Sequence, residues 1–312
     1  MTDIFIRLGA SLGLFLGSLA IGWWLSRRRL LTETTASRLI QWIVKWPSPL
    51  VLCLSFWRMD LRSVEPWLLP LVGVAVSAST LLPAFLYARR AGVSRPQTGS
   101  FLTCAFFSNV GYFGAFTAFA LFGEAAFALC MLYLVFFTPC FYTLGFGIAS
   151  RYGRPQAPSG LAAAFNDELR LYPFLGMLAG ALLSLVRVPR PPFFERVNHA
   201  LIPLDTALYL IVIGSQLSFA SPRPWLRPCL AMSGIKFLYT PLIAWLLVGL
   251  LDLQGLPRLV VLLEASTPVA VSPLVLPLLF GLDRQLSNAL WLFTTLLAIP
   301  WLLFAVPVLQ LL

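Results

Sequence analysis

Long apolar stretches alternate with short polar ones along the whole chain. Each apolar stretch has about the 20 residues that a helix needs to cross the hydrocarbon core of a bilayer. The stretches lie at roughly residues 4–25, 37–57, 66–88, 98–121, 125–148, 170–187, 197–218, 228–250, 257–280 and 286–310. The pattern predicts an all-α integral membrane protein of about ten transmembrane helices.

The composition supports a protein whose solvent is lipid. Of its 312 residues, 59% are hydrophobic and only 11% are charged, and the mean hydropathy is +0.86. Soluble domains have about 25% charged residues. The net charge of +10 does not indicate nucleic-acid binding, because the arginines stand in short clusters between apolar stretches. We expect the lipid bilayer as a partner and no nucleic acid.

The arginine clusters also predict the orientation. Loops after odd-numbered spans hold more Lys and Arg than the opposite loops, as at Arg27–Arg29, Arg89, Arg90 and Arg151. By the positive-inside rule these loops face the cytoplasm. We therefore expect a multi-pass protein of the cell (inner) membrane with both termini on the non-cytoplasmic side. The first apolar stretch lacks a small-residue cleavage site, so we expect it to be retained.

One longer polar segment, residues 150–167, divides the chain near its midpoint. We interpret it as a cytoplasmic linker between a first five-helix repeat, 1–149, and a second, 168–312. An odd number of spans in each half gives the halves opposite orientations. Inverted repeats with broken helices near the midplane are a common transporter architecture.

Two matching spans contain residues that interrupt helices. The fourth contains Ser108-Asn109-Val110-Gly111-Tyr112-Phe113-Gly114, and the ninth contains Ser266-Thr267-Pro268-Val269-Ala270-Val271-Ser272-Pro273. Proline removes a backbone donor, and asparagine can bond its own backbone instead of the helix ladder. Irregular backbone at membrane depth persists only inside protein or beside a cavity. The simpler alternative is that these residues merely kink their helices, but both stretches are dense, polar and matched in position.

These two stretches supply our candidate substrate-binding residues. Two interruptions that cross would direct the N-terminal ends of half-helices, each equivalent to about +0.5 charge, at one point suited to a carboxylate. The candidates are Ser108, Asn109, Gly111, Gly114, Ser266, Thr267, Pro268 and Ser272.

Four ionisable residues inside or near spans are candidates for coupling or charge compensation, because such residues are costly in a membrane. Glu264 lies one turn before Pro268 and is a candidate proton carrier or cation ligand. Lys236 and Lys45 are candidates for attracting the substrate or pairing with Glu264 or Asp205, and Asp205 is a second candidate for proton coupling. Each also has a structural alternative, either pairing with an opposite charge or reaching the water interface.

Enzymatic chemistry finds no support in the motifs. The sequence has no HExxH, GxSxG or P-loop, and its five cysteines form no CxxC pair. We expect no catalytic residues, no metal and no cofactor.

The interrupted spans resemble the auxin efflux carrier family, which includes the plant PIN proteins and is related to the bile acid/sodium symporters. The family pattern Asn-x-Gly-(Phe/Tyr)-x-Gly-x-Pro reads here Asn109, Gly111, Tyr112 and Gly114, with Phe116 where proline is usual. The ninth-span pattern is matched by Ala265, Pro268 and Ala270, the seventh-span pattern by Gly214 and Leu217, and the last span by Phe293–Pro300.

The resemblance implies two inverted five-helix repeats with crossing broken helices four and nine, a homodimer and elevator-type alternating access. It also implies efflux or exchange of a small organic anion, such as a carboxylate or an auxin-like acid, with Asn109 near the carboxylate. The coupling ion, proton or sodium, stays open. Alternatives are a sodium-coupled symporter of the bile-acid type and a membrane sensor that binds a ligand without moving it.

Overall fold

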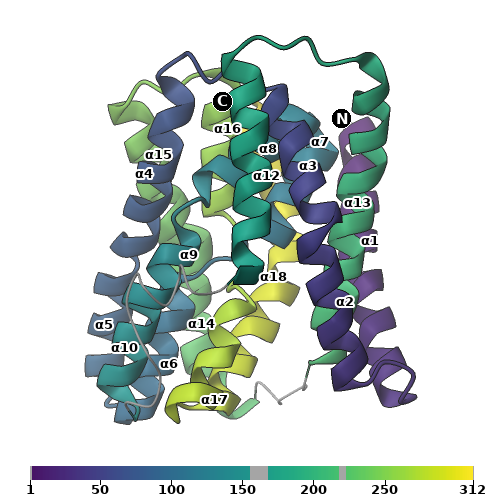
Figure 1. Ribbon diagram of the computed structural model, residues 1–312. Coiled ribbons are helices and arrows are strands. Elements are labelled where there is room, and N and C mark those ends of the chain that lie inside the picture. The colour runs from purple at the N-terminus through teal and green to yellow at the C-terminus, as the bar shows by residue number, and fades with distance from the viewer. Residues whose placement is uncertain (1, 155–167, 218–222, 312) are drawn as a thin grey trace. The chain divides into compact units, whose positions relative to one another are not determined.

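The computed structural model describes residues 2–154, 168–217 and 223–311, and these residues are almost entirely helical (Figure 1). In chain order the elements are α1 (Thr2–Arg27), α2 (Glu33–Lys45), α3 (Pro47–Trp57), α4 (Glu65–Ser79), α5 (Leu81–Arg90), α6 (Arg95–Phe106), η1 (Val110–Gly114), α7 (Ala115–Phe122), α8 (Glu124–Tyr133), α9 (Phe137–Cys140), η2 (Phe141–Gly145), α10 (Phe146–Tyr152), α12 (Glu168–Leu185), α13 (Pro192–Ser215), η3 (Arg223–Trp225), α14 (Leu226–Gly234), η4 (Ile235–Tyr239), α15 (Thr240–Leu250), α16 (Gly255–Ala265), η5 (Ser272–Val275), α17 (Leu276–Phe280) and α18 (Arg284–Leu311).

Seven helical stretches in the described part of the chain are long and apolar enough to cross a membrane: Phe5–Arg27, Glu33–Trp57, Glu65–Arg90, Glu124–Tyr152, Pro192–Ser215, Leu226–Leu250 and Arg284–Val306. The other three predicted spans, the fourth, sixth and ninth, are helical but short or interrupted. The all-α membrane class is therefore confirmed, and the count of ten spans stays a prediction.

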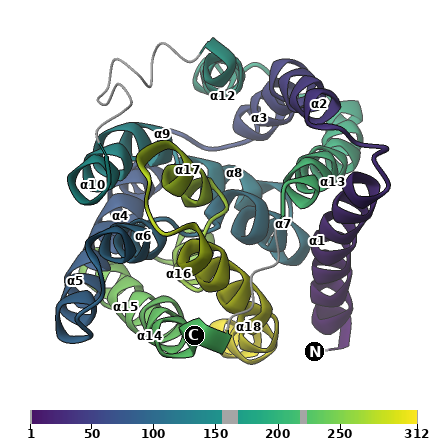
Figure 2. The same ribbon diagram turned by 90° about the horizontal axis from the view of Figure 1, so that it is seen from below.

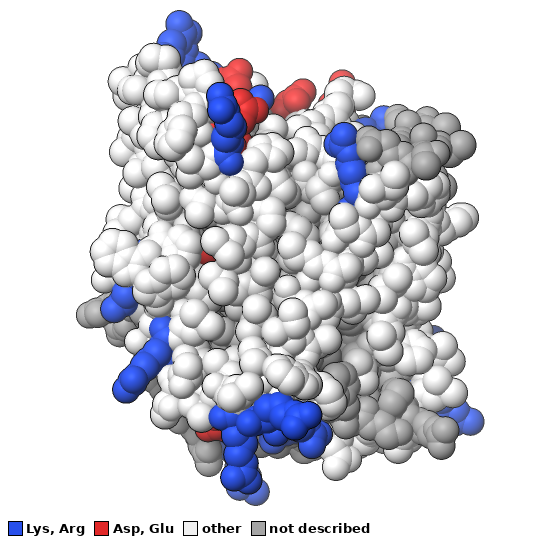
Figure 3. Space-filling view, turned by 90° about the vertical axis from the view of Figure 1, so that its right-hand side faces the viewer, with Lys and Arg blue, Asp and Glu red and all other residues white. Residues whose placement is uncertain are grey.

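The surface fits contact with lipid. On the face drawn in Figure 3, most Lys and Arg side chains gather toward the upper and lower ends, and the surface between is almost wholly uncharged. Large apolar side chains such as Leu71, Leu82, Trp245 and Leu250 are exposed. Exposed apolar surface on this scale is unfavourable in water and is expected where hydrocarbon is the solvent.

The chain forms two compact units, and each draws on both halves of the sequence. Unit 1 contains residues 1–67, 115–132 and 165–217, and unit 2 contains residues 68–114, 133–164 and 218–312. The predicted division into repeats at 149 and 168 does not coincide with these units and stays a prediction. Most of the predicted linker, residues 155–167, lies outside the described residues.

Helices in unit 1 approach each other closely at glycines. Helix α1 packs along α13, and α3 packs along α12 (Figures 1 and 2). A Cβ at Gly22 or Gly214 would lie about 2 Å from a backbone oxygen of the other helix, at Ile211 and Leu19 respectively, and Gly176 and Gly180 of α12 lie equally close to α3. Small residues at such contacts permit the backbone approach on which membrane helix packing depends.

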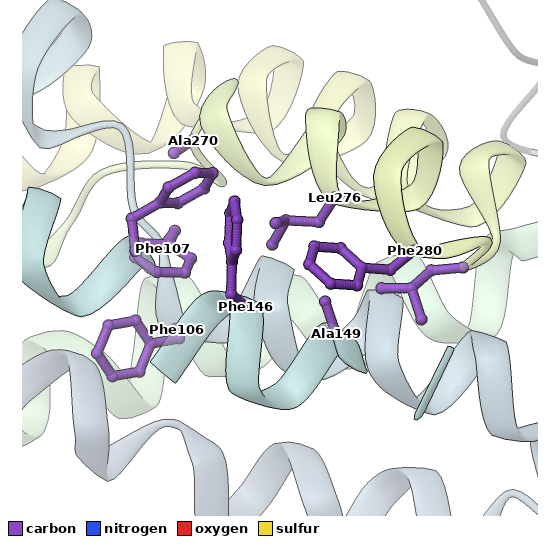
Figure 4. Packing of buried hydrophobic residues seen from close by; sticks show 9 residues of the cluster. Phe106, Phe107, Phe146, Ala149, Ala270, Leu276 and Phe280 are labelled. Carbon is purple, nitrogen blue, oxygen red and sulfur yellow. The ribbon is translucent and has the colours of Figure 1, made fainter. Parts of the chain in front are cut away.

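Unit 2 is built around α6, against which α5, α10, α14 and α18 all pack (Figure 2). Every residue of α6 from Thr98 to Phe106 is buried, so this helix has no lipid-facing side. A cluster of apolar side chains, among them Phe107, Phe146, Leu276 and Phe280, also includes Phe106, the last residue of α6 (Figure 4). The end of α6 is therefore enclosed by protein, which is where interrupted backbone is tolerated in a membrane.

Candidate functional site

The two interruptions meet inside unit 2. The N–H of Asn109 donates to the carbonyl of Pro268 at 2.8 Å, and the N–H of Ala270 donates to the carbonyl of Phe107 at 3.0 Å. Ser108 and Val269 thus form an isolated antiparallel bridge. Figure 4 shows Phe107 and Ala270 next to each other at one end of the apolar cluster. Each interruption therefore satisfies backbone groups that the other leaves without a helical partner.

The first interruption depends on Asn109 and the glycines that follow. Since the Asn109 N–H is given to Pro268, it is not available to the carbonyl of Ala105, four residues earlier. That carbonyl instead accepts from the ammonium of Lys236 at 2.6 Å and lies 2.9 Å from the Thr80 hydroxyl. The Asn109 carbonyl accepts from the N–H of Gly114 at 3.0 Å, and the chain continues as the wide turn η1.

The second interruption is held by hydroxyls. Thr294 of α18 accepts from the N–H of Val269 at 3.2 Å. The Ser266 and Thr267 hydroxyls turn back and donate to the carbonyls of Leu262 and Glu264. Their protons are thus used within α16, and only their oxygen lone pairs remain for a ligand. Pro268 contributes its carbonyl, which accepts from Asn109.

Three donors for an anion remain at the two interruptions. Asn109 is 3% exposed, and its side-chain Nδ2 makes no hydrogen bond within the described residues. Ser108 accepts from Lys236 at 2.7 Å, which leaves the Ser108 proton to be donated elsewhere. The Ser272 hydroxyl, at the start of η5, is also buried without a hydrogen bond to the described part of the chain. Buried donors of this kind are commonly satisfied by a ligand or water.

Glu264 lies against the first interruption. Its side chain is fully buried, and a Cβ at Gly114 would lie only 2.1 Å from its Oε2. Gly111 has no such neighbour, since its nearest contact would be Leu134 Cδ2 at 3.7 Å. Gly114 is therefore required for the close approach of a carboxylate, and Gly111 is not.

The other two charged candidates lie in unit 1. Asp205 of α13 accepts from the Ser48 hydroxyl of α3 at 2.9 Å. Lys45 is exposed at the end of α2, with its ammonium 5.8 Å from the ring centre of Tyr172. Of the four candidates, the structure places only Lys236 and Glu264 in the unit that contains the interruptions.

A pocket opens beside the first interruption within unit 2. Its polar groups include Ser108 and Ser77, and its walls include Phe106, Phe107 and Phe136. The volume of the pocket is only about 30 Å³, far below the ~300 Å³ of small ligand sites, so an organic ligand would need it to widen.

Two contributors were missed by the sequence analysis. Thr294 lies in the last-span segment that resembles the family pattern, so that pattern could have identified it. Thr80 gave no signal, because a threonine between two apolar helical segments indicates no particular partner.

Comparison with known proteins gives one family and two relatives. Residues 164–306 match the family described as membrane transport protein. An uncharacterized transporter of Methanothermobacter thermautotrophicus is 25% identical over 283 residues, covering 89% of this chain and 91% of that protein. An uncharacterized transporter of Methanocaldococcus jannaschii is 27% identical over 206 residues, covering 64% of this chain and 65% of that protein. The family match confirms the resemblance inferred from the interrupted spans.

Proposed function

Because residues 164–306 match the membrane transport protein family, we propose that the protein is a secondary active transporter of a small organic anion, working by efflux or exchange. The substrate is a carboxylate or an auxin-like acid, bound where the two interrupted spans meet. Its carboxylate accepts hydrogen bonds from Asn109 Nδ2 and the Ser108 hydroxyl, while its organic part contacts the aromatic walls of the adjacent pocket.

The observation that carries this proposal is the mutual pairing of the interruptions. Backbone hydrogen bonds join Asn109 to Pro268 and Ala270 to Phe107. Buried donors remain beside these bonds. Helices also begin at this place, at Val110 and Ser272. The N-terminal end of a helix carries partial positive charge, which favours an anion.

Helix contacts support the proposal of two inverted repeats. In such repeats spans one to five correspond to spans six to ten. The contact of α1 with α13 then corresponds to that of α12 with α3, and α5 with α6 corresponds to α15 with α16. Likewise α10 with α6 corresponds to α18 with α16, and all six of these contacts are present.

The division into units supports elevator-type alternating access. Such a mechanism needs one compact body that carries the whole site. Unit 2 contains both interruptions, Lys236, Glu264 and the pocket. We propose unit 2 as the moving body, unit 1 as the stationary one, a homodimer as the working form and the cell (inner) membrane as the location.

Replacing Asn109 with alanine tests the proposed site. The Asn109→Ala protein, purified and reconstituted in vesicles, should lose at least about 90% of its carboxylate counterflow, because one hydrogen bond to a charged group contributes ~1.5–3 kcal/mol. The panel should contain mono- and dicarboxylates and an indole acid.

The matched control is Gln254→Ala, which removes an exposed amide that donates to Asp252. The control should transport at the wild-type rate. Unchanged counterflow by Asn109→Ala across every anion that the wild type carries would exclude this site, and no counterflow of any anion by the wild type would contradict the proposed function.

A further inference from the structure

Lys236 is a lysine in the interior of a membrane protein, and its side chain points inward. It lies in η4, midway along the Leu226–Leu250 helix, and is 0% exposed. A lysine in a span usually extends its side chain to the membrane surface. Here the ammonium instead donates to the Ala105 carbonyl at 2.6 Å and to the Ser108 hydroxyl at 2.7 Å.

The two oxygen atoms that receive the ammonium belong to the end of a half-helix. Ala105 is in the last turn of α6, where the helix carries partial negative charge. The interruption also removes the helical donor of this carbonyl, because the Asn109 N–H bonds to Pro268. The position therefore offers a carbonyl and a hydroxyl oxygen to a cation.

Carriers with broken helices use such positions for their coupling ion. Unwound carbonyls and the C-terminal ends of half-helices coordinate sodium or take part in proton coupling. A sodium ion at the end of α6 would need the oxygen atoms that Lys236 already contacts. The Lys236 ammonium has three N–H donors, so it can satisfy these oxygen atoms with hydrogen bonds where a sodium ion would coordinate them.

We propose that Lys236 is a built-in cation that takes the place of a coupling sodium ion at the end of α6, so that this protein works without sodium. The inference rests on the proposed function, since it concerns the coupling of that transport. Lys236 acts as a positioning residue: it holds the end of α6 and the Ser108 hydroxyl, whose proton then faces the substrate.

The first measurement uses the unaltered protein. Its melting temperature in detergent should be the same in sodium chloride and in choline chloride of equal concentration, and its counterflow in vesicles should be equal in the two salts. A sodium-dependent rise of several degrees, or flux that requires sodium, would overturn the proposal.

The second measurement replaces the ammonium with space or with an apolar chain. Lys236→Ala leaves the oxygen atoms of Ala105 and Ser108 facing a cavity, so its melting temperature should rise with n-propylammonium or sodium but not with choline. Lys236→Met fills the same space without a charge, so it should melt below the wild type in every salt. If Lys236 only fills space, Lys236→Met should be as stable as the wild type, and added cations should not change the melting temperature of Lys236→Ala. Either result would overturn the proposal.

The melting experiments need no substrate. If no tested anion moves, the proposed function fails while the salt response of the two variants still decides the role of Lys236. If anions move but the melting results contradict the proposal, only the role of Lys236 is wrong.

Discussion

Gly114 lies at a close contact between the two interrupted spans. A Cβ at this position would lie 2.1 Å from Glu264 Oε2, whereas a Cβ at Gly111 would have 3.7 Å to its nearest neighbour. Both glycines belong to the same wide turn, η1. The Cδ and Oε1 atoms of the buried Glu264 carboxylate would also lie within 3 Å of a Cβ at Gly114, at 2.7 and 2.8 Å, so the two glycines provide a matched pair of positions.

Alanine at these two positions should have opposite outcomes. Gly114→Ala should destabilise the protein by ~1–3 kcal/mol, the usual cost of overpacking a filled interior, and reduce counterflow. Gly111→Ala should leave both within error of the wild type. Thermal melting of the purified variants and counterflow in vesicles provide the readouts, and equal melting temperatures for the two variants would contradict the close contact at Glu264.

At this scale the sequence located the two interruptions better than it predicted the hydrogen bonds that their residues make. Asn109 and Pro268 could be singled out because an amide and a proline disturb a helix locally. The use of the Ser266 and Thr267 protons within α16 could not be foreseen, since a hydroxyl can bond to its own helix or to a ligand equally well. For Lys236 the sequence left an anion, Glu264 and Asp205 open as partners, and the structure gives it carbonyl and hydroxyl oxygens instead.

Among the elements, the long helices follow the apolar stretches, because length and hydropathy alone decide which segments can lie in lipid. The wide turns at η1, η2 and η4 could not be predicted. A wide turn shifts the helical hydrogen bonds by one residue and leaves the apolar pattern nearly unchanged. The first interruption also forms without proline, since Phe116 continues within α7 while Asn109 redirects the backbone.

A buried ionic network joins several elements of unit 1 at the start of α8. Glu124 accepts from both terminal nitrogens of Arg190, at 2.7 and 3.2 Å, and from Asn198 of α13. Arg190 also donates to the carbonyl of Leu54 in α3. The side chains of Arg190 and Glu124 are 9% and 2% exposed, so neither charge can rely on water.

Replacing Glu124 with glutamine should leave the Arg190 charge buried without its partner. The expected loss of stability is ~3–5 kcal/mol, the cost of breaking a buried pair from one side. The control is Glu195→Gln, which breaks an ion pair with Arg58 whose side chains are 49% and 50% exposed. Exposed ion pairs contribute little to stability. The melting temperature should therefore fall clearly for Glu124→Gln and hardly at all for Glu195→Gln. Similar melting temperatures for the two variants would show that the network does not stabilise unit 1.

For the whole molecule, the order of the spans was predictable and their grouping was not. The sequence divides at the polar segment 150–167, yet each compact unit takes segments from both sides of it. The grouping depends on which helices can approach each other, as at Gly22, Gly176, Gly180 and Gly214. A glycine in an apolar stretch indicates a close neighbour but does not identify it.

The number of spans can be decided by the positions of the two ends. Seven described helices are long enough to cross, and the fourth, sixth and ninth predicted spans are short or interrupted. With seven crossings the termini lie on opposite sides of the membrane, whereas with ten they lie on the same side. The distribution of arginines predicts that this side is outside the cytoplasm.

Reporters at three positions therefore test the topology of the complete fold. Alkaline phosphatase fused after Leu312 should be active, and an epitope before Met1 should be cut by protease added to intact spheroplasts. A fluorescent protein inserted within residues 155–167 should fluoresce, because that linker is expected in the cytoplasm. An inactive phosphatase together with an accessible N-terminal epitope would mean an odd number of crossings, and two inverted repeats of five spans would then be impossible.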